Sequence, residues 1–195
     1  MVTSPAIKIP YHLKVSEEQF WQLVWANPEL RMERTAEGEL IVMPPTGSEG
    51  GSFNLELSTD LAIWNRQTLL GIAFDSSTGF RLPNGAIRSP DSSWVTKSRW
   101  DALTPEQRQG FAPICPDFVL ELASVSDDIE ELRLKMQEYI NNGCRLGWLI
   151  DPRTKQVEIY RPNQPVEVLQ APDSISGEDI LPGFLLNLQL IFAKS

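Results

Sequence analysis

The stretch from residue 117 to residue 150 constrains the fold most, because its periodicity changes from that of a strand to that of a helix and back. Residues 117–123 and 145–150 are apolar runs of strand length. Between them, residues 126–142 place apolar side chains at helical spacing. A crossover helix of this kind folds back along the sheet that its strands form. We therefore expect an α/β protein in which this helix covers one face of a sheet.

The rest of the sequence supplies shorter elements around this unit. An acidic helix start at Ser16 is followed by a hairpin whose turn contains Gly38. A long helix is expected over residues 52–70. The remaining predicted strands are residues 72–75, 79–82, 92–96, 155–160 and 166–169. A hairpin or meander followed by a strand–helix–strand crossover predicts a mixed central β-sheet flanked by helices.

The length of 195 residues suits one domain. We predict a single domain over residues 15–195, preceded by an extended, proline-containing arm over residues 1–14. The apolar runs are shorter than the roughly 20 residues that cross a bilayer, and the first residues lack the basic and apolar regions of a secretion signal. We therefore expect a cytoplasmic protein with no membrane partner.

Cysteine and histidine are scarce, which argues against several kinds of site. Cys115 and Cys144 are too few for a disulfide framework and too far apart in sequence for a metal knuckle, so small buried thiols are their simplest interpretation. The single histidine, His12, rules out a histidine-rich metal site and disfavours a Ser-His-Asp hydrolase. Carboxylates and lysines remain as candidates for a catalytic site.

The net charge of −9 and the pI of about 4.7 argue against a broad nucleic-acid-binding surface. They do not exclude a nuclease, because a catalytic site built from carboxylates is acidic until a metal ion neutralises it. A dimer could also bring the few arginines together on one face. DNA therefore stays in consideration as a partner, although the charge disfavours it.

Glu121 is the first candidate site residue. It shares a strand face with Val119 and Ala123, where an unpaired carboxylate would be costly. On a helical wheel, Lys135 lies beside the apolar stripe of the following helix, from which its long side chain can reach back toward Glu121. The alternatives are a glutamate exposed on a sheet edge and a lysine that extends to solvent. Spacing alone leaves both interpretations open.

Asp91 is the second candidate, because it comes directly before the predicted strand 92–96. If that strand lies beside residues 117–123, the carboxylates of Asp91 and Glu121 come close together. Two like charges at short distance need a cation or a shared proton, and Mg²⁺, which binds oxygen ligands and retains water, meets that need. The simpler alternative is that Pro90 and Asp91 form an ordinary turn.

Several longer segments carry a resemblance to a known family. They are residues 116–124 (PDFVLELAS), 135–139 (KMQEY) and 147–152 (GWLIDP), together with Glu33 ahead of residues 38–47 (GELIVMPPTG). With these segments the chain resembles the Uma-type restriction endonuclease family of the PD-(D/E)XK, restriction-endonuclease-like superfamily, over about residues 15–192. The superfamily usually has its lysine two residues after the glutamate, where this chain has Ala123. In the Uma-type family the lysine is understood to lie on the following helix, which is what Lys135 resembles.

The resemblance implies the restriction-endonuclease-like fold and a role for each of four residues. Asp91 and Glu121 would bind Mg²⁺ or Mn²⁺, and Lys135 would orient or activate the attacking water and steady the charge on the phosphate. Glu33 would be an auxiliary ligand or an acid that supports the ligands from behind. Gln137 and Tyr139 are weaker candidates, and core packing is the simpler role for Tyr139. The implied activity is that of a metal-dependent endonuclease acting on phosphodiester bonds of DNA, as a homodimer if it cuts both strands.

Two departures from the family pattern keep other functions open. Residues 49–51 are Glu-Gly-Gly where many relatives carry a histidine, and residues 127–131 are mostly acidic where relatives often have arginines. Both leave the four candidate residues in place but weaken the case for binding the phosphate backbone. The alternative is a catalytically silent binding or regulatory protein that keeps the nuclease fold. A nuclease that acts on RNA or branched DNA is a third interpretation.

Overall fold

The computed structural model describes residues 12–193. Most of the predicted arm over residues 1–14 lies outside the described residues. In chain order, the helices and strands are α1 (Glu17–Ala26), β1 (Arg31–Arg34), β2 (Leu40–Met43), α2 (Ser48–Thr68), β3 (Gly71–Asp75), β4 (Phe80–Arg81), β5 (Ile87–Arg88), β6 (Ser92–Thr96), α3 (Lys97–Asp101), α4 (Pro105–Gln109), β7 (Phe118–Leu122), α5 (Ile129–Asn141), β8 (Leu146–Asp151), β9 (Gln156–Tyr160), β10 (Glu167–Gln170), β11 (Ser174–Ser176), β12 (Leu185–Asn187) and α6 (Gln189–Phe192).

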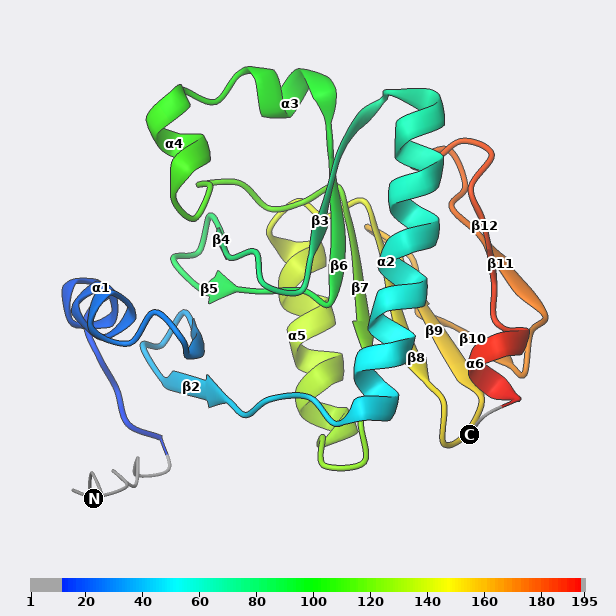
Figure 1. Cartoon of the computed structure of the whole chain (residues 1–195), viewed down its shortest axis with the longest axis horizontal. Coiled ribbons are helices and arrows are strands. Elements are labelled where there is room, and N and C mark those ends of the chain that lie inside the picture. Colours follow the sequence, from blue (N-terminus) through cyan, green and yellow to red (C-terminus); the bar gives the residue numbers. More distant parts are fainter. Residues whose placement is uncertain (1–11, 194–195) are drawn as a thin grey trace.

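The central layer is a six-stranded sheet with the strand order β10-β9-β8-β7-β6-β3 (Figure 1). Strands β7 and β8 are parallel and are connected by α5, as the strand–helix–strand pattern predicts. The other neighbouring strands of this sheet are antiparallel. The predicted fold class, a mixed central sheet flanked by helices, is therefore confirmed.

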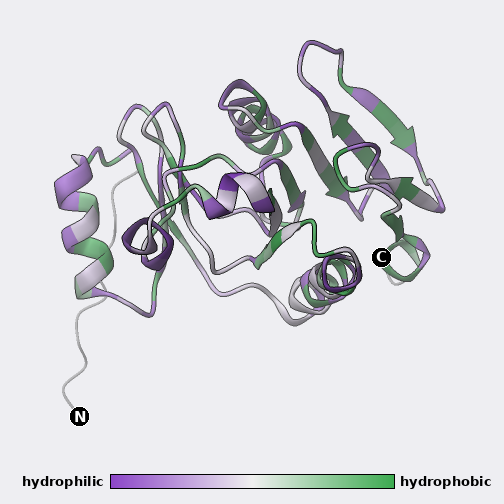
Figure 2. Cartoon of the chain, turned by 90° about the horizontal axis from the view of Figure 1, so that it is seen from above, coloured by the Kyte–Doolittle hydropathy of each residue, from purple (hydrophilic) through white to green (hydrophobic). Residues whose placement is uncertain are grey.

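Helices α2 and α5 cover opposite faces of this sheet. On β7, Phe118 and Leu120 belong to the core that α2 covers, whereas Val119 belongs to the core that α5 covers. Figure 2 shows the strands of the sheet coloured mainly as apolar residues, with one of these helices on each side. The predicted alternation along residues 117–123 is thus confirmed, and it places Glu121 on the side of α5.

A second, smaller sheet carries Glu33. Its strand order is β2-β1-β5-β4, and the predicted hairpin of β1 and β2 pairs Glu33 with Ile41. Strand β5, which the sequence pattern did not predict, pairs with β1 through Arg34 and Ile87. Because β5 ends three residues before Asp91, this pairing brings β1 close to the start of β6.

Two helices begin at residues other than those predicted. α5 begins at Ile129 rather than residue 126, because the segment before it folds into a turn. The carboxylates of Asp127 and Asp128 accept hydrogen bonds from the backbone N–H groups of Ser124 (2.7 Å) and Glu130 (2.9 Å). α2 begins at residue 48 rather than 52, so the glycines at 50–51 are helical. Among the residues that the structure describes, none of the helices combines the length and apolar character that a bilayer span requires.

The C-terminal elements β11, β12 and α6 were also not predicted. They pack apolar side chains, among them Ile175, Leu186 and Ile191, into the core that α2 covers. The indole N–H of Trp64 on α2 donates to the carbonyl of Pro182, at 3.0 Å. These contacts pack α2 against the sheet, and the first turn of the same helix borders the cavity described next.

Candidate active site

Four predicted side chains come from four different parts of the fold. Glu33 lies on β1, Asp91 directly before β6, Glu121 on β7 and Lys135 on α5. The ammonium of Lys135 is 2.9 Å from Oε1 of Glu121 and 3.0 Å from Oε1 of Glu33. The crossover helix therefore reaches back to the strand that precedes it, as the helical wheel predicts. Glu121 is buried and paired, which answers the alternative of an exposed edge glutamate.

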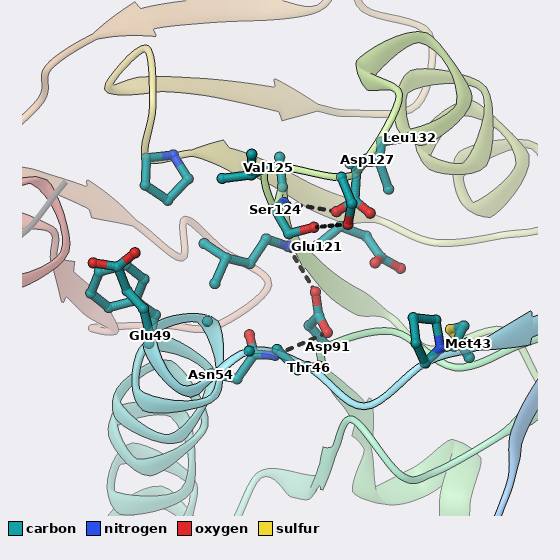
Figure 3. A pocket seen from close by; sticks show the side chains of 18 of the residues that line it. Met43, Thr46, Glu49, Asn54, Asp91, Glu121, Ser124, Val125, Asp127 and Leu132 are labelled. Atoms are coloured by element: carbon teal, nitrogen blue, oxygen red, sulfur yellow. Dashed lines mark hydrogen bonds between the residues drawn. The ribbon is translucent and has the colours of Figure 1, made fainter.

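Asp91 lies beside Glu121 because β6 and β7 are neighbours, with Ser92 opposite Leu120. Its Oδ2 atom accepts a hydrogen bond from the backbone N–H of Leu122, at 2.9 Å. Its Oδ1 atom accepts one from the side-chain amide of Asn54, at 3.2 Å. Figure 3 shows both bonds, and both Asp91 and Glu121 line the same cavity. Strands β6 and β7 are therefore adjacent, which is the condition under which the carboxylates of Asp91 and Glu121 were expected to come close together.

A chain of alternating charges extends from this pair into the protein. It runs Glu138, Arg88, Glu33, Lys135 and Glu121, each in contact with the next. The links of Arg88 are 2.5 Å to Glu138 and 3.1 Å to Glu33. Because each interior member has a partner of opposite sign on both sides, these charges can be buried. These ion pairs hold the ammonium of Lys135 next to the carboxylate of Glu121.

Glu33 and Glu121 also accept hydrogen bonds from uncharged donors. The backbone N–H of Ser89 donates to Oε1 of Glu33, at 2.9 Å. The hydroxyl of Tyr139 donates to Oε1 of Glu121, at 3.0 Å. Tyr139 is fully buried, so it combines the predicted core packing with a polar contact to the site. The side chain of Gln137 bonds Asn141 on the exposed face of α5 and lies away from the site.

A cavity of about 700 Å³ opens in front of Asp91, Glu121 and Lys135. Residues 43–50, which connect β2 to the first turn of α2, form one wall, and residues 122–127 form another. Arg31 and Arg153 also line it. The positive end of the α2 dipole borders this cavity, although Glu49 in the first turn opposes it.

Comparison with known proteins identifies the family. The model of the Uma2 family, described as "Putative restriction endonuclease", matches residues 17–189. The chain belongs to the Uma2 family. No curated protein matches the chain significantly. Among solved structures, the chain is similar to a "putative nuclease belonging to DUF820" from Anabaena variabilis ATCC 29413, with a TM-score of 0.71 at 23% identity over 83% of this chain and 89% of that one. This second likeness shows the fold.

In this Uma2 protein, Asp91 and Glu121 both resist ionisation. Burial raises the pKa of Glu121 to about 7, and the neighbouring Asp91 adds repulsion, while Lys135 opposes both effects. Burial likewise raises the pKa of Asp91, against the hydrogen bond from Leu122 and the charge of Lys135. Two neighbouring carboxylates that ionise reluctantly are an arrangement that a bound cation stabilises.

The pKa values of Glu33 and Lys135 are shifted in the direction that favours the charged forms. Burial alone would raise the pKa of Glu33, but the charges of Lys135 and Arg88 outweigh it and lower that pKa below 4.5. Burial alone would lower the pKa of Lys135, but Glu121 and Glu33 raise it above 10.5. Both groups are therefore charged at neutral pH, which is the condition for their mutual ion pair.

The oxygen donors of the site fit Mg²⁺ or Mn²⁺. Within residues 12–193, no cluster of three or more His, Cys, Asp or Glu side chains could hold a metal ion. Mg²⁺ does not need one, because it commonly uses one or two carboxylates and retains several waters. Asp91 and Glu121 offer that number of hard ligands at the wall of an open cavity. The oxygens of Glu33 already accept from Lys135, Ser89 and Arg88, so Glu33 suits the supporting position better than that of a ligand.

Three residues of the site were missed from the sequence. Arg88 and Glu138 complete the charge chain, and Asn54 binds Asp91. Asn54 had a usable signal, because it lies directly beside the buried stripe of Phe53, Leu57 and Leu61 on α2. Arg88 and Glu138 meet across 50 residues of chain, which no local pattern encodes.

Proposed function

We propose that this Uma2 protein is a metal-dependent endonuclease that hydrolyses phosphodiester bonds of DNA. In this proposal, Asp91 and Glu121 are the metal ligands and Lys135 is the catalytic cation. Glu33 holds Lys135 in place. The observation that carries the proposal is the contact of the Lys135 ammonium with Glu121, beside Asp91, at the wall of an accessible cavity.

Each residue has a definite task in this reaction. Mg²⁺ or Mn²⁺ bound by the two carboxylates would polarise the phosphate and lower the pKa of a bound water. Lys135 has three N–H donors, and Glu33 and Glu121 take two of them, which leaves one for the attacking water or a phosphate oxygen. Tyr139 and Lys135 both contact Oε1 of Glu121, and in this proposal the other carboxylate oxygen is the metal ligand. A fixed positive charge at that point stabilises charge that develops on the phosphate.

The predicted assembly and location belong to the same proposal. The enzyme would act as a single domain over residues 15–195, and as a homodimer when it cuts both strands, since each strand needs its own site. A cytoplasmic location agrees with a DNA substrate. The net charge of −9 supports a second candidate function, a silent binding or regulatory protein with the same fold.

Cleavage of supercoiled plasmid in Mg²⁺ or Mn²⁺ tests the proposal. The wild-type chain is expected to nick or linearise the plasmid, and EDTA is expected to stop the reaction. Glu121→Gln and Lys135→Met should each lower the rate about 100-fold or more, because each removes charge from the reacting centre. Gln137→Ala, an exposed change on the same helix, is the matched control and should leave the rate unchanged.

The two candidate functions give different results. A folded wild-type protein that cleaves no DNA in either metal, while it binds DNA or another partner, supports the silent binding protein. Activity that survives both site variants contradicts the assignment of the site. Parallel reactions with single-stranded RNA and with branched DNA decide which nucleic acid the site cuts best.

A further inference from the structure

Arg31 is unusual among the basic side chains of the cavity, because the described part of the chain offers its side chain neither a hydrogen-bond partner nor an ion-pair partner. Lys135 pairs with Glu33 and Glu121, and Arg153 contacts both oxygens of Asp151. By contrast, the side chain of Arg31 forms neither a hydrogen bond nor an ion pair with any residue in the range 12–193, and its Nε atom is buried. A buried donor without an acceptor is costly, so its presence in the cavity calls for an external acceptor.

The position of Arg31 on β1 explains why it faces the cavity. Residues two apart on a strand share a face, so Arg31 lies on the same face as Glu33, which holds Lys135. Arg31 is paired across the hairpin with Met43, where the cavity wall of residues 43–50 begins. Strand β1 therefore presents Glu33 to Lys135 and presents Arg31 to the open part of the cavity.

Among residues 12–193, no acidic side chain near Arg31 forms an ion pair with it. Its positive charge favours the ionised forms of Asp91 and Asp75, but it forms an ion pair with neither. An additional anion can therefore enter between Arg31 and the carboxylate pair. That anion must itself tolerate two nearby carboxylates, and a phosphate that shares a divalent cation with them does so.

We propose that Arg31 binds a backbone phosphate of the substrate and holds it against Asp91 and Glu121. The inference rests on the proposed nuclease function and names the residue that supplies its missing phosphate contact. A guanidinium suits this task, because its planar fork of N–H groups can bind two phosphate oxygens at once. A chain of net charge −9 cannot rely on a broad basic surface, so a dedicated contact inside the cavity gains importance.

Binding measured at several salt concentrations tests this role. The probe is a fluorescent DNA duplex, titrated in Ca²⁺ in place of Mg²⁺ so that binding is followed without cleavage. Arg31→Met should weaken binding about 10- to 100-fold, the range expected for a lost charge-assisted contact. The slope of log K against log salt should fall by about 0.9 for one lost phosphate contact on a duplex. Arg31→Lys should keep the slope but recover only part of the affinity, because it keeps the charge and loses the fork.

Two controls separate binding from structure. Arg66→Met removes the same charge from an exposed position of α2 outside the cavity, and it should leave affinity unchanged. Arg31→Met should also leave the melting temperature unchanged or raise it, because it removes an unsatisfied buried donor. A structural role for Arg31 predicts a lower melting temperature. In Mg²⁺, the loss should appear in KM more than in kcat.

The outcomes distinguish this inference from the proposed function. If the wild-type chain binds DNA and Arg31→Met binds with the same affinity and salt slope, the role of Arg31 is contradicted and the nuclease proposal stands. An equal loss in Arg66→Met contradicts it as well. If the wild-type chain neither binds nor cleaves nucleic acid, the proposed function fails and this inference fails with it.

Discussion

Replacing Arg88 with methionine gives a sharp test of the buried charge chain. Arg88 donates to Glu33 at 3.1 Å and to Glu138 at 2.5 Å, and only 10% of its side chain is exposed. Methionine has a similar length but neither the charge nor the donors. The variant therefore leaves two carboxylates short of a partner without opening a large cavity.

The size of the effect follows from what each carboxylate retains. Removing one partner of a buried ion pair costs about 3–5 kcal/mol. The lower end applies here, because Glu33 keeps Lys135 and Ser89, and Glu138 keeps a hydrogen bond from Asn84. A loss of about 3 kcal/mol in a chain of this length corresponds to a fall in melting temperature of about 6–12 °C.

The loss should also depend on pH. In the wild-type chain the pKa of Glu33 is lowered below 4.5, so this carboxylate stabilises the fold above pH 4.5, and the stabilisation is lost as the pH falls through the folded-state pKa. Arg88 is one cause of that lowered pKa. Without Arg88 the pKa of Glu33 in the folded protein should rise, so the difference between wild type and Arg88→Met should be largest near neutral pH and should shrink as the pH falls and Glu33 of the variant takes up a proton first.

Thermal unfolding followed by circular dichroism between pH 4 and pH 7 measures both quantities. Arg81→Met is the matched control, because Arg81 pairs with Glu17 at the surface, with side-chain exposures of 46% and 39%. It should cost less than about 1 kcal/mol. A loss for Arg88→Met no larger than for Arg81→Met, or one that does not change with pH, would refute the reasoning.

Three further predictions concern the core, the thiols and the site. Gly71→Ala should destabilise the fold by about 1–3 kcal/mol in urea unfolding, because the new Cβ would lie 2.2 Å from a backbone oxygen of β6, and an unchanged midpoint would contradict this. Burial raises the pKa of Cys115 to about 12, so at pH 8 this thiol should react with Ellman's reagent only after unfolding, and rapid labelling of the native chain would show that it is accessible. Tyr139→Phe should lower the cleavage rate about tenfold by removing one of the two donors that hold Oε1 of Glu121, while DNA affinity in Ca²⁺ stays the same, and an unchanged rate would remove Tyr139 from the site.

The central part of the fold could be predicted because its signals are local. The change of period between residues 117–123 and 126–142 identified β7, α5 and their crossover. The elements after β10 could not be predicted in the same way. β11 and β12 have only three residues each and α6 has four, so packing against α2 rather than their own pattern decides their structure.

The residues of the site likewise differ in whether a local sequence pattern indicates them. Strand alternation and the helical wheel made Glu121 and Lys135 candidates but left the exposed alternatives open, as the position before β6 did for Asp91. The resemblance to the Uma-type family then selected the three residues, and the structure brings them together. Arg88 could not be identified, because its partners come from β1 and α5 and meet only when the small sheet docks on the helix. Arg31 carries no sequence signal either, since a partnerless charge is a property of the folded cavity.

The most direct test of the proposed site is single-turnover cleavage of an end-labelled DNA duplex by wild type and Asp91→Asn, at saturating enzyme and in Mg²⁺. Asparagine keeps the shape of Asp91 and can keep the hydrogen bond from Leu122, but it lacks the charge that holds a divalent cation. We predict cleavage by wild type and a rate at least about 100-fold lower for Asp91→Asn, with an unchanged melting temperature in the absence of metal. Equal rates for the two proteins would contradict the assignment of Asp91 and Glu121 as the metal site.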